Sequence, residues 1–114
     1  MLKIDGVEMP APVKYDVGIM DLSKAERNAL GDMVIDRIAT KRKIELDLTG
    51  LSNEEISKVL KAVSPVFFEV EYFDPQENRL QTGTFYSGDR NAKGLRYEQG
   101  KLLWKGLSFN IIEQ

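Results

Sequence analysis

Carboxylates are the residues of this chain whose type and spacing come nearest to a catalytic arrangement. Glu69 and Glu71 lie two residues apart, and so do Glu45 and Asp47. A suitably separated carboxylate pair can hydrolyse a glycosidic bond. Alternate positions of an antiparallel strand, however, place charges on its solvent face as a rule. We therefore interpret both pairs as solvated or intersubunit faces, and we expect the protein not to be an enzyme.

The chain lacks the residue types that most other kinds of catalytic or metal site require. The chain contains no histidine and no cysteine, which excludes Ser–His and Cys–His nucleophiles, zinc fingers, iron–sulfur clusters and disulfides. Asp74 and the run Asp89-Arg90-Asn91 carry oxygen ligands, but their spacing lacks the aspartate series of an EF-hand loop. Neither glycine-rich phosphate-binding motif occurs. We interpret these segments as turns and expect no metal and no cofactor.

Length and charge narrow the class further. With 114 residues, of which 42% are hydrophobic, the chain is long enough for one domain, residues 1–114, with its own core. With a net charge of −2, the protein has no overall positive potential that would attract nucleic acid or an anionic membrane. No apolar stretch approaches the length of a membrane span. We expect neither a membrane nor nucleic acid among its partners.

Basic residues and one tryptophan are the remaining candidates for a site. Lys41, Arg42 and Lys43 form a run that, with basic residues further along the chain, can contact an acidic neighbour, although such runs also simply discourage wrong strand pairing. Trp104 belongs either to a second core layer or to an interface, where tryptophan is enriched. The candidate subunit interface therefore consists of Lys41, Arg42, Lys43, Asp89, Arg90, Lys93 and Trp104.

The elements that position these residues are mostly strands. Alternation around Asp5-Gly6 predicts a short hairpin, and the period-two pattern continues in Val13–Leu22. We interpret the polar segment Ser23–Asp32 as a loop. The chain becomes apolar again at Met33, and the alternation from Ile44 to Leu48 is the clearest strand signal in this half.

One helix is predicted between two strands. Ser52 and Glu55 match a capping box, and Pro65 ends the segment, which places the helix at about residues 52–64. Its apolar residues fall at i, i+3, i+4 and i+7, a single stripe that must dock on a sheet because so short a helix is marginal alone.

The second half of the chain predicts further hairpins. Val66–Phe73 alternates as a strand, the turn at 74–78 follows, and Gly83 in the next strand indicates a bulge. We interpret Ser87–Gly94 as a polar loop before a final hairpin that turns at Gln99-Gly100. In the last strand one face is predicted to carry Leu103, Leu107, Phe109 and Ile111, with Trp104 on the other.

These elements predict a mainly β, α+β fold. A helix that occurs once, rather than after each strand, argues against a doubly wound parallel sheet. We expect an antiparallel β-sandwich or barrel of about seven strands with one flanking α-helix.

Nearly the whole chain resembles a family of small phage and prophage tail structural proteins from siphophages of Gram-positive bacteria. The segments that carry the resemblance are Met1-Leu2-Lys3-Ile4-Asp5-Gly6-Val7-Glu8-Met9-Pro10, Lys41-Arg42-Lys43, Val66-Phe67-Phe68, Tyr72-Phe73-Asp74-Pro75, Thr84-Phe85-Tyr86-Ser87-Gly88-Asp89-Arg90 and the ending Leu103-Trp104-Lys105-Gly106-Leu107-Ser108-Phe109-Asn110-Ile111-Ile112-Glu113. In strand and helix order the chain is also similar to tail tube and distal tail proteins.

The resemblance implies a virion structural protein of the tail, either a tube or a distal tail or baseplate component. Such a protein is made in the host cytoplasm and then becomes part of the virion. It implies self-assembly into a ring-type homo-oligomer, a hexamer in the similar proteins, and docking to other phage tail proteins. By this analogy residues 23–32 and 87–94 are arms that reach a neighbouring subunit and order on assembly.

Two further classes stay open beside this one. Within the same particle, the chain can be a head–tail connector or a tail terminator. In a different class, it is a small monomeric binding module for nucleic acid or protein, whose binding would weaken with salt in the case of nucleic acid.

Overall fold

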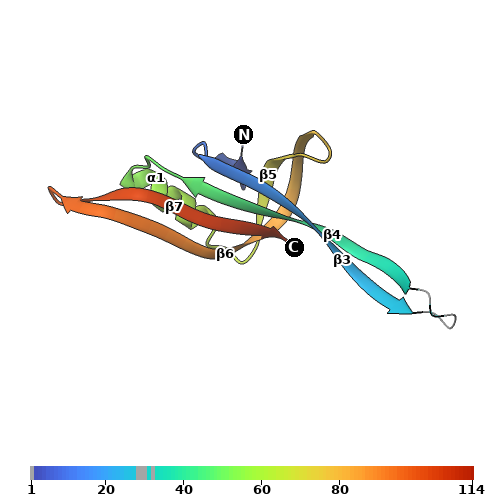
Figure 1. Ribbon diagram of the computed structural model, residues 1–114. Coiled ribbons are helices and arrows are strands. Elements are labelled where there is room, and N and C mark those ends of the chain that lie inside the picture. The colour runs from blue at the N-terminus through green and yellow to red at the C-terminus, as the bar shows by residue number, and fades with distance from the viewer. Residues whose placement is uncertain (1, 28–30, 32) are drawn as a thin grey trace.

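Seven strands and one helix make up the computed structural model, which describes residues 2–27, 31 and 33–114 (Figure 1). The elements in chain order are β1 (Lys3–Ile4), β2 (Val7–Glu8), β3 (Lys14–Arg27), β4 (Met33–Leu48), α1 (Asn53–Ala62), β5 (Phe68–Asp74), β6 (Arg79–Glu98) and β7 (Lys101–Glu113).

All seven strands belong to one sheet, in the order β2-β1-β5-β6-β7-β4-β3, and each neighbouring pair is antiparallel. The sheet bends over the core, because residues of β3 and β4 also contact β5, which lies three or more strands away in that order. The Tyr15 hydroxyl donates to the carbonyl of Phe73 at 2.9 Å, and Arg42 forms an ion pair with Asp74. The prediction of a mainly β, antiparallel, sandwich- or barrel-like fold with one helix is confirmed.

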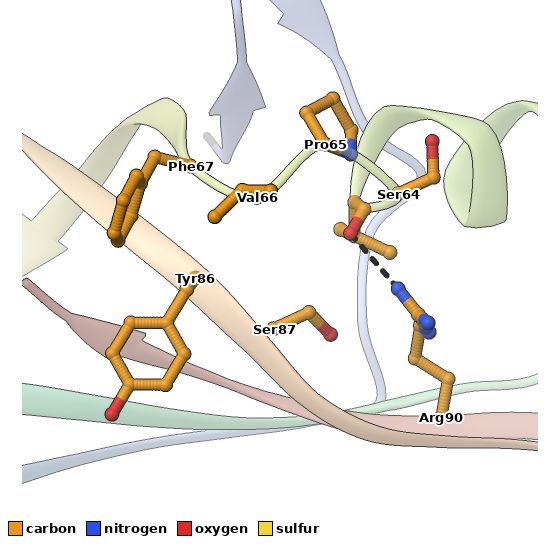
Figure 2. A pocket seen from close by; sticks show the side chains of 8 residues that line it. Ser64, Pro65, Val66, Phe67, Tyr86, Ser87 and Arg90 are labelled. Atoms are coloured by element: carbon orange, nitrogen blue, oxygen red, sulfur yellow. Dashed lines mark hydrogen bonds between the residues drawn. The ribbon is translucent and has the colours of Figure 1, made fainter.

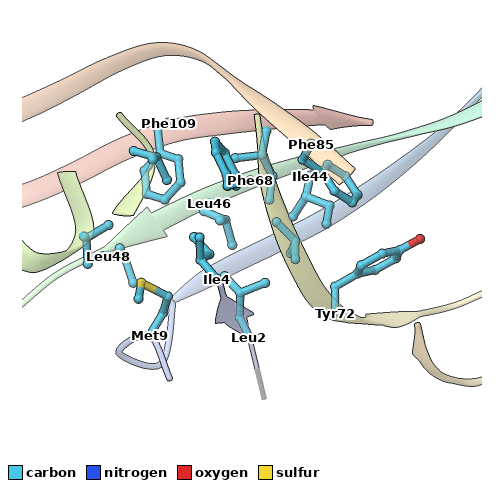
Figure 3. Packing of buried hydrophobic residues seen from close by; sticks show 14 of the residues in the cluster. Leu2, Ile4, Met9, Ile44, Leu46, Leu48, Phe68, Tyr72, Phe85 and Phe109 are labelled. Atoms are coloured by element: carbon cyan, nitrogen blue, oxygen red, sulfur yellow. The ribbon is translucent and has the colours of Figure 1, made fainter. Parts of the chain in front are cut away.

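The core lies inside this bend (Figure 3). Strand β5 shows why the sequence folds this way: Phe68, Val70 and Tyr72 are buried, while Glu69 between them is exposed, as period-two alternation requires. Tyr72 and Phe85 meet edge to face with ring centroids 5.3 Å apart. Strands β1, β4, β5, β6 and β7 contribute buried residues, and the first hairpin and the helix close the cluster formed by Leu2, Ile4, Met9, Ile44, Leu46, Leu48, Val59, Val63, Phe68, Val70, Tyr72, Phe85, Leu107, Phe109 and Ile111.

Helix α1 begins where its capping box predicts. The backbone N–H of Glu55 donates to the Ser52 hydroxyl at 3.2 Å, and the Ser52 N–H donates to the Glu55 carboxylate at the same distance. Val59 and Val63 are fully buried against the sheet. The capping box therefore determines where the helix begins, and the apolar stripe determines which side packs on the sheet.

Two ribbons of two strands each project from the core in opposite directions (Figure 1). Strand β4 pairs with β7 only over Lys43–Leu48, so the remainder of the β3–β4 hairpin continues beyond the sheet. Strand β5 pairs with β6 only as far as Phe85, and the distal part of the β6–β7 hairpin continues on the other side. The radius of gyration is 18.2 Å, compared with about 13 Å for a compact chain of this length.

Residues 23–27 of one predicted loop and all of the other, 87–94, are strands, and for these residues the predictions were wrong. Of the predicted loop 23–32, residues 23–27 continue β3, and residues 28–30 and 32 lie outside the described part. The predicted loop 87–94 lies within β6. The polar residues of 87–94 are consistent with a strand, because their side chains are exposed or half-buried there.

The predicted bulge at Gly83 was also wrong, since Gly83 pairs in regular register with Val70. The irregularities lie further along β6, where the pairing with β7 shifts between Ser87 and Arg90 and twice around Gly94. Gly88 sits at the first shift, and a Cβ there would come within 2.1 Å of the Asn110 side-chain oxygen. The glycine that permits close approach is therefore Gly88.

Candidate assembly surfaces

Arg42, one of the predicted interface residues, is held inside the subunit. Its Nε donates to Asp74 Oδ1 at 3.1 Å, and its Nη2 donates to Asp74 Oδ2 at 3.3 Å. The Asp74 side chain is 1% exposed and the Arg42 side chain 13%. The hydrogen bond from Arg42 lowers the pKa of Asp74 against the opposing effect of burial, and the Glu77 N–H contributes in the same direction. This pair joins β4 to the end of β5 across the core.

Neighbouring groups complete the same junction. The backbone N–H of Arg42 donates to the Glu113 carboxylate at 3.0 Å, and the Lys41 ammonium donates to the carbonyl of Gln114. Burial raises the pKa of Tyr15 to about 12, because the charged phenolate would be poorly solvated there. Lys43 is half-buried on β4, opposite Ile112. The basic run therefore ties β4 to the C-terminal strand and to β5.

Asp89, Arg90 and Lys93 lie on β6 but do not form one patch. The Arg90 guanidinium donates to the Val63 carbonyl at 3.0 Å, where a cation satisfies the C-terminal end of α1 (Figure 2). Asp89 instead lines a shallow polar depression with Lys14 and Glu45. Lys93 is exposed on the β6–β7 ribbon.

Trp104 is half-buried and contacts the helix. Its indole N–H donates to the Asn53 side-chain oxygen at 2.6 Å, and it lines an open pocket with Leu102 and Leu60. Leu103, predicted to share the buried face of the last strand, is 38% exposed instead. That part of the prediction was wrong because the pairing of β7 with β6 shifts between Gly106 and Trp104. The face turned to α1 therefore carries Trp104 and Leu102 instead of Leu103.

The sequence reasoning missed an aromatic pocket at the junction of α1, β5 and β6. Val66 and Phe67, from the segment before β5, and Tyr86 on β6 line an open pocket of about 460 Å³ (Figure 2). The Phe67 and Tyr86 rings meet edge to face with centroids 6.4 Å apart. A signal was present in the consecutive Phe67 and Phe68, since adjacent residues of an extended segment point to opposite sides and only one can enter the core.

This pocket is one end of a larger exposed surface. On the outer side of β5, Glu69, Glu71 and Phe73 follow Phe67 at alternate positions, and the paired residues of β6 complete the surface. We name it the acidic–aromatic face, made of Phe67, Glu69, Glu71, Phe73, Leu80, Thr82, Thr84 and Tyr86. The carboxylate pair Glu69 and Glu71 is open to solvent here, with Lys3 at 4.0 Å from Glu71.

The second carboxylate pair, Glu45 and Asp47, lies on the opposite part of the sheet beside Lys14. The Lys14 ammonium is 3.6 Å from Glu45 and 3.6 Å from Asp16. Asp16, then Glu45, raises the pKa of Lys14. These carboxylates are half-exposed or exposed and face a cation, an arrangement that is typical of a solvated sheet surface.

Within residues 2–27, 31 and 33–114, no group of three or more acidic, histidine or cysteine side chains is placed to hold a metal ion. Over the same described part, no helix has the length and apolar character needed to cross a membrane.

Comparison with known proteins gives one result that covers the whole chain. Neither the curated proteins nor the solved structures gave a match. A family model described as "Family of unknown function (DUF6711)" matches residues 1–114, and the chain therefore belongs to that family.

Proposed function

We propose that the protein is a structural subunit that assembles with copies of itself and has no enzymatic role. The observation that carries this proposal is the pair of two-stranded ribbons that leave the small core in opposite directions (Figure 1). An isolated two-stranded ribbon is marginally stable in water. A subunit that extends two of them gains stability when the ribbons pack on neighbouring subunits.

Exposed apolar side chains on both ribbons support this reading. On β3, Ile19 is 42% exposed and Met20 is exposed beside it. On the β6–β7 ribbon, Tyr97 is 73% exposed and Leu95 is also exposed. Large apolar residues gathered on projecting elements are typical of protein–protein contact surfaces.

Unpaired edges of the sheet also support self-assembly. Strand β3 forms one edge of the sheet over its whole length, and β6 has no neighbour on its β5 side beyond Phe85 within the described residues. Unpaired backbone N–H and C=O groups along an edge can accept a strand from another chain.

We place this subunit in a phage tail, as a tube or distal tail and baseplate component, on the resemblance of nearly the whole chain to small siphophage tail proteins. Its partners are then further copies in a ring, a hexamer by analogy, and other tail proteins. It is made in the host cytoplasm and then enters the virion. Three of the predicted interface residues, Asp89, Arg90 and Lys93, are exposed in the single subunit and available for these contacts, although Arg90 also donates to the Val63 carbonyl.

Molar mass by light scattering after size exclusion, over a range of protein concentrations, tests the proposal. We expect an oligomer, or a mass that rises with concentration above the 12.9 kDa of one chain. Two variants locate the contacts. One replaces residues 95–103 by Asn-Gly, which closes a hairpin between the directly paired Gly94 and Trp104. The other replaces 22–39 by Asn-Gly between Asp21 and Thr40, which also pair.

Both shortened variants keep every residue of the described core cluster, so each should unfold cooperatively as the full chain does. We expect at least one of them to associate at least tenfold more weakly. A full-length chain that stays monomeric at millimolar concentration contradicts the proposal and favours the monomeric binding module instead.

A further inference from the structure

Charge is distributed unevenly between the β6–β7 ribbon and the rest of the molecule. Between residues 93 and 105 the chain has four basic side chains and one acidic side chain, Glu98, a net charge of +3. The basic residues are Lys93, Arg96, Lys101 and Lys105. Since the whole chain has a net charge of −2, the remainder has −5.

Two of these basic side chains, Arg96 and Lys101, lie on one side of the ribbon together with Glu98, whose carboxylate is 3.1 Å from the Arg96 guanidinium. The cross-strand pairs Arg96–Leu103 and Glu98–Lys101 place these four side chains on the same side. The neighbouring positions Leu102 and Trp104 are turned toward α1, where they line a pocket with helix residues. The side that bears Arg96, Lys101 and Leu103 is exposed, and its end at Lys101 and Leu103 borders the start of the helix at Ser52–Glu54.

The opposite charge gathers on the acidic–aromatic face and the first hairpin beside it. Glu69 and Glu71 lie on β5, and Glu8 pairs with Lys3, which in turn pairs with Glu71. The Asp5 carboxylate accepts the backbone N–H of Glu69 at 2.9 Å. Four acidic side chains and one basic side chain give this surface a net charge of −3.

We propose that the exposed side of the β6–β7 ribbon of one copy docks on the acidic–aromatic face of a second copy. This inference rests on the proposed self-assembly and names its contact. Arg96 and Lys101 face Glu69 and Glu71, and Leu103 packs against the aromatic side chains of the face. Aromatic and arginine side chains at the centre with charges around them are typical of specific interfaces.

The two surfaces cannot meet within one molecule. Both are carried by the single strand β6, whose residues Thr84 and Arg96 are twelve positions apart, about 40 Å along an extended strand. Each copy therefore offers one surface and receives the other. Such a head-to-tail contact repeats, and it gives a closed ring or an open filament according to the rotation between copies.

A charge exchange tests the docking. Lys101→Glu reverses a charge on the ribbon, and Glu69→Lys reverses one on the face; both side chains are exposed, so the fold should persist. We expect each variant alone to associate at least tenfold more weakly than wild type in sedimentation velocity. A 1:1 mixture of the two should recover association, because the new glutamate of one copy meets the new lysine of the other.

Two matched controls are available at residues that belong to neither surface, Lys61 on α1 and Glu77 in the turn after β5. Lys61→Glu and Glu77→Lys change exposed residues by the same charge, and we expect association within twofold of wild type. Wild-type association that persists in both reversed variants, or a mixture that stays as weak as its components, overturns the docking and leaves self-assembly standing. A wild-type chain that never associates overturns both.

Discussion

The buried pair of Arg42 and Asp74 allows a quantitative test of how the sheet is closed. Asp74 accepts three hydrogen bonds, at 3.1 and 3.3 Å from Arg42 and at 3.1 Å from the Glu77 N–H. Asp74→Asn removes the charge and turns an amide donor toward the guanidinium. Breaking a buried pair by changing one partner costs about 3–5 kcal/mol. We expect a value near the lower end, about 3 kcal/mol, because Gln76 still accepts from Arg42 at 3.2 Å.

Urea unfolding at pH 7 measures this loss. With a slope of about 1.5 kcal/mol per M, a loss of about 3 kcal/mol moves the midpoint down by about 2 M. The matched control is Asp89→Asn, an exposed carboxylate on β6, whose midpoint should stay within the equivalent of about 0.5 kcal/mol of wild type.

The pH dependence of the free energy of unfolding tests the same pair in a second way. Because Arg42 lowers the pKa of Asp74 in the folded chain, the carboxylate stabilises the fold fully above its unfolded pKa of about 3.9, and this contribution is lost as the pH falls through the lower, folded value. The difference between wild type and Asp74→Asn should therefore shrink below about pH 4. Equal midpoints at pH 7, or a difference that is unchanged at pH 2, would refute the reasoning.

Three further substitutions test the packing described above, each by chemical denaturation. Phe109→Ala should lose about 3–5 kcal/mol, since the ring is buried in the core; a loss below about 0.5 kcal/mol would contradict its placement. Gly88→Ala should destabilise the protein by about 1–3 kcal/mol because the new Cβ meets the Asn110 oxygen, and Asn110→Ala should restore part of this loss. Trp104→Phe removes the hydrogen bond to Asn53 and should cost about 1 kcal/mol; an unchanged midpoint would argue against that bond.

Local signals in the sequence were sufficient for the elements that depend on neighbouring residues. The capping box of Ser52 and Glu55 located the helix, and Asp5-Gly6 located the first turn, where both residues have positive φ, 50° and 80°. The alternation of Phe68 and Val70 identified the buried face of β5. In each case the sequence pattern that gave the prediction spans only a few consecutive residues.

The predictions were wrong where the structure depends on contacts between residues that are far apart in the sequence. Residues 87–94 look like a loop because they are polar and contain two glycines, yet their register opposite β7 makes them a strand. Nothing in the local pattern pairs Arg42 with Asp74, which is 32 positions away. The acidic–aromatic face likewise appears only when β6 is aligned with β5, because its two halves come from different segments.

The order of strands in the sheet has a kinetic consequence for the newly made chain. The β3–β4, β5–β6 and β6–β7 hairpins join sequence neighbours and can form early. The pairings Ile4–Val70 and Ile44–Ile111, by contrast, join residues more than 60 positions apart. Such nonlocal pairings slow folding. In a chain whose β7 is still within the ribosome, β4 therefore has no partner strand on its β7 side. The pairing over Lys43–Leu48 forms only after β7 has emerged.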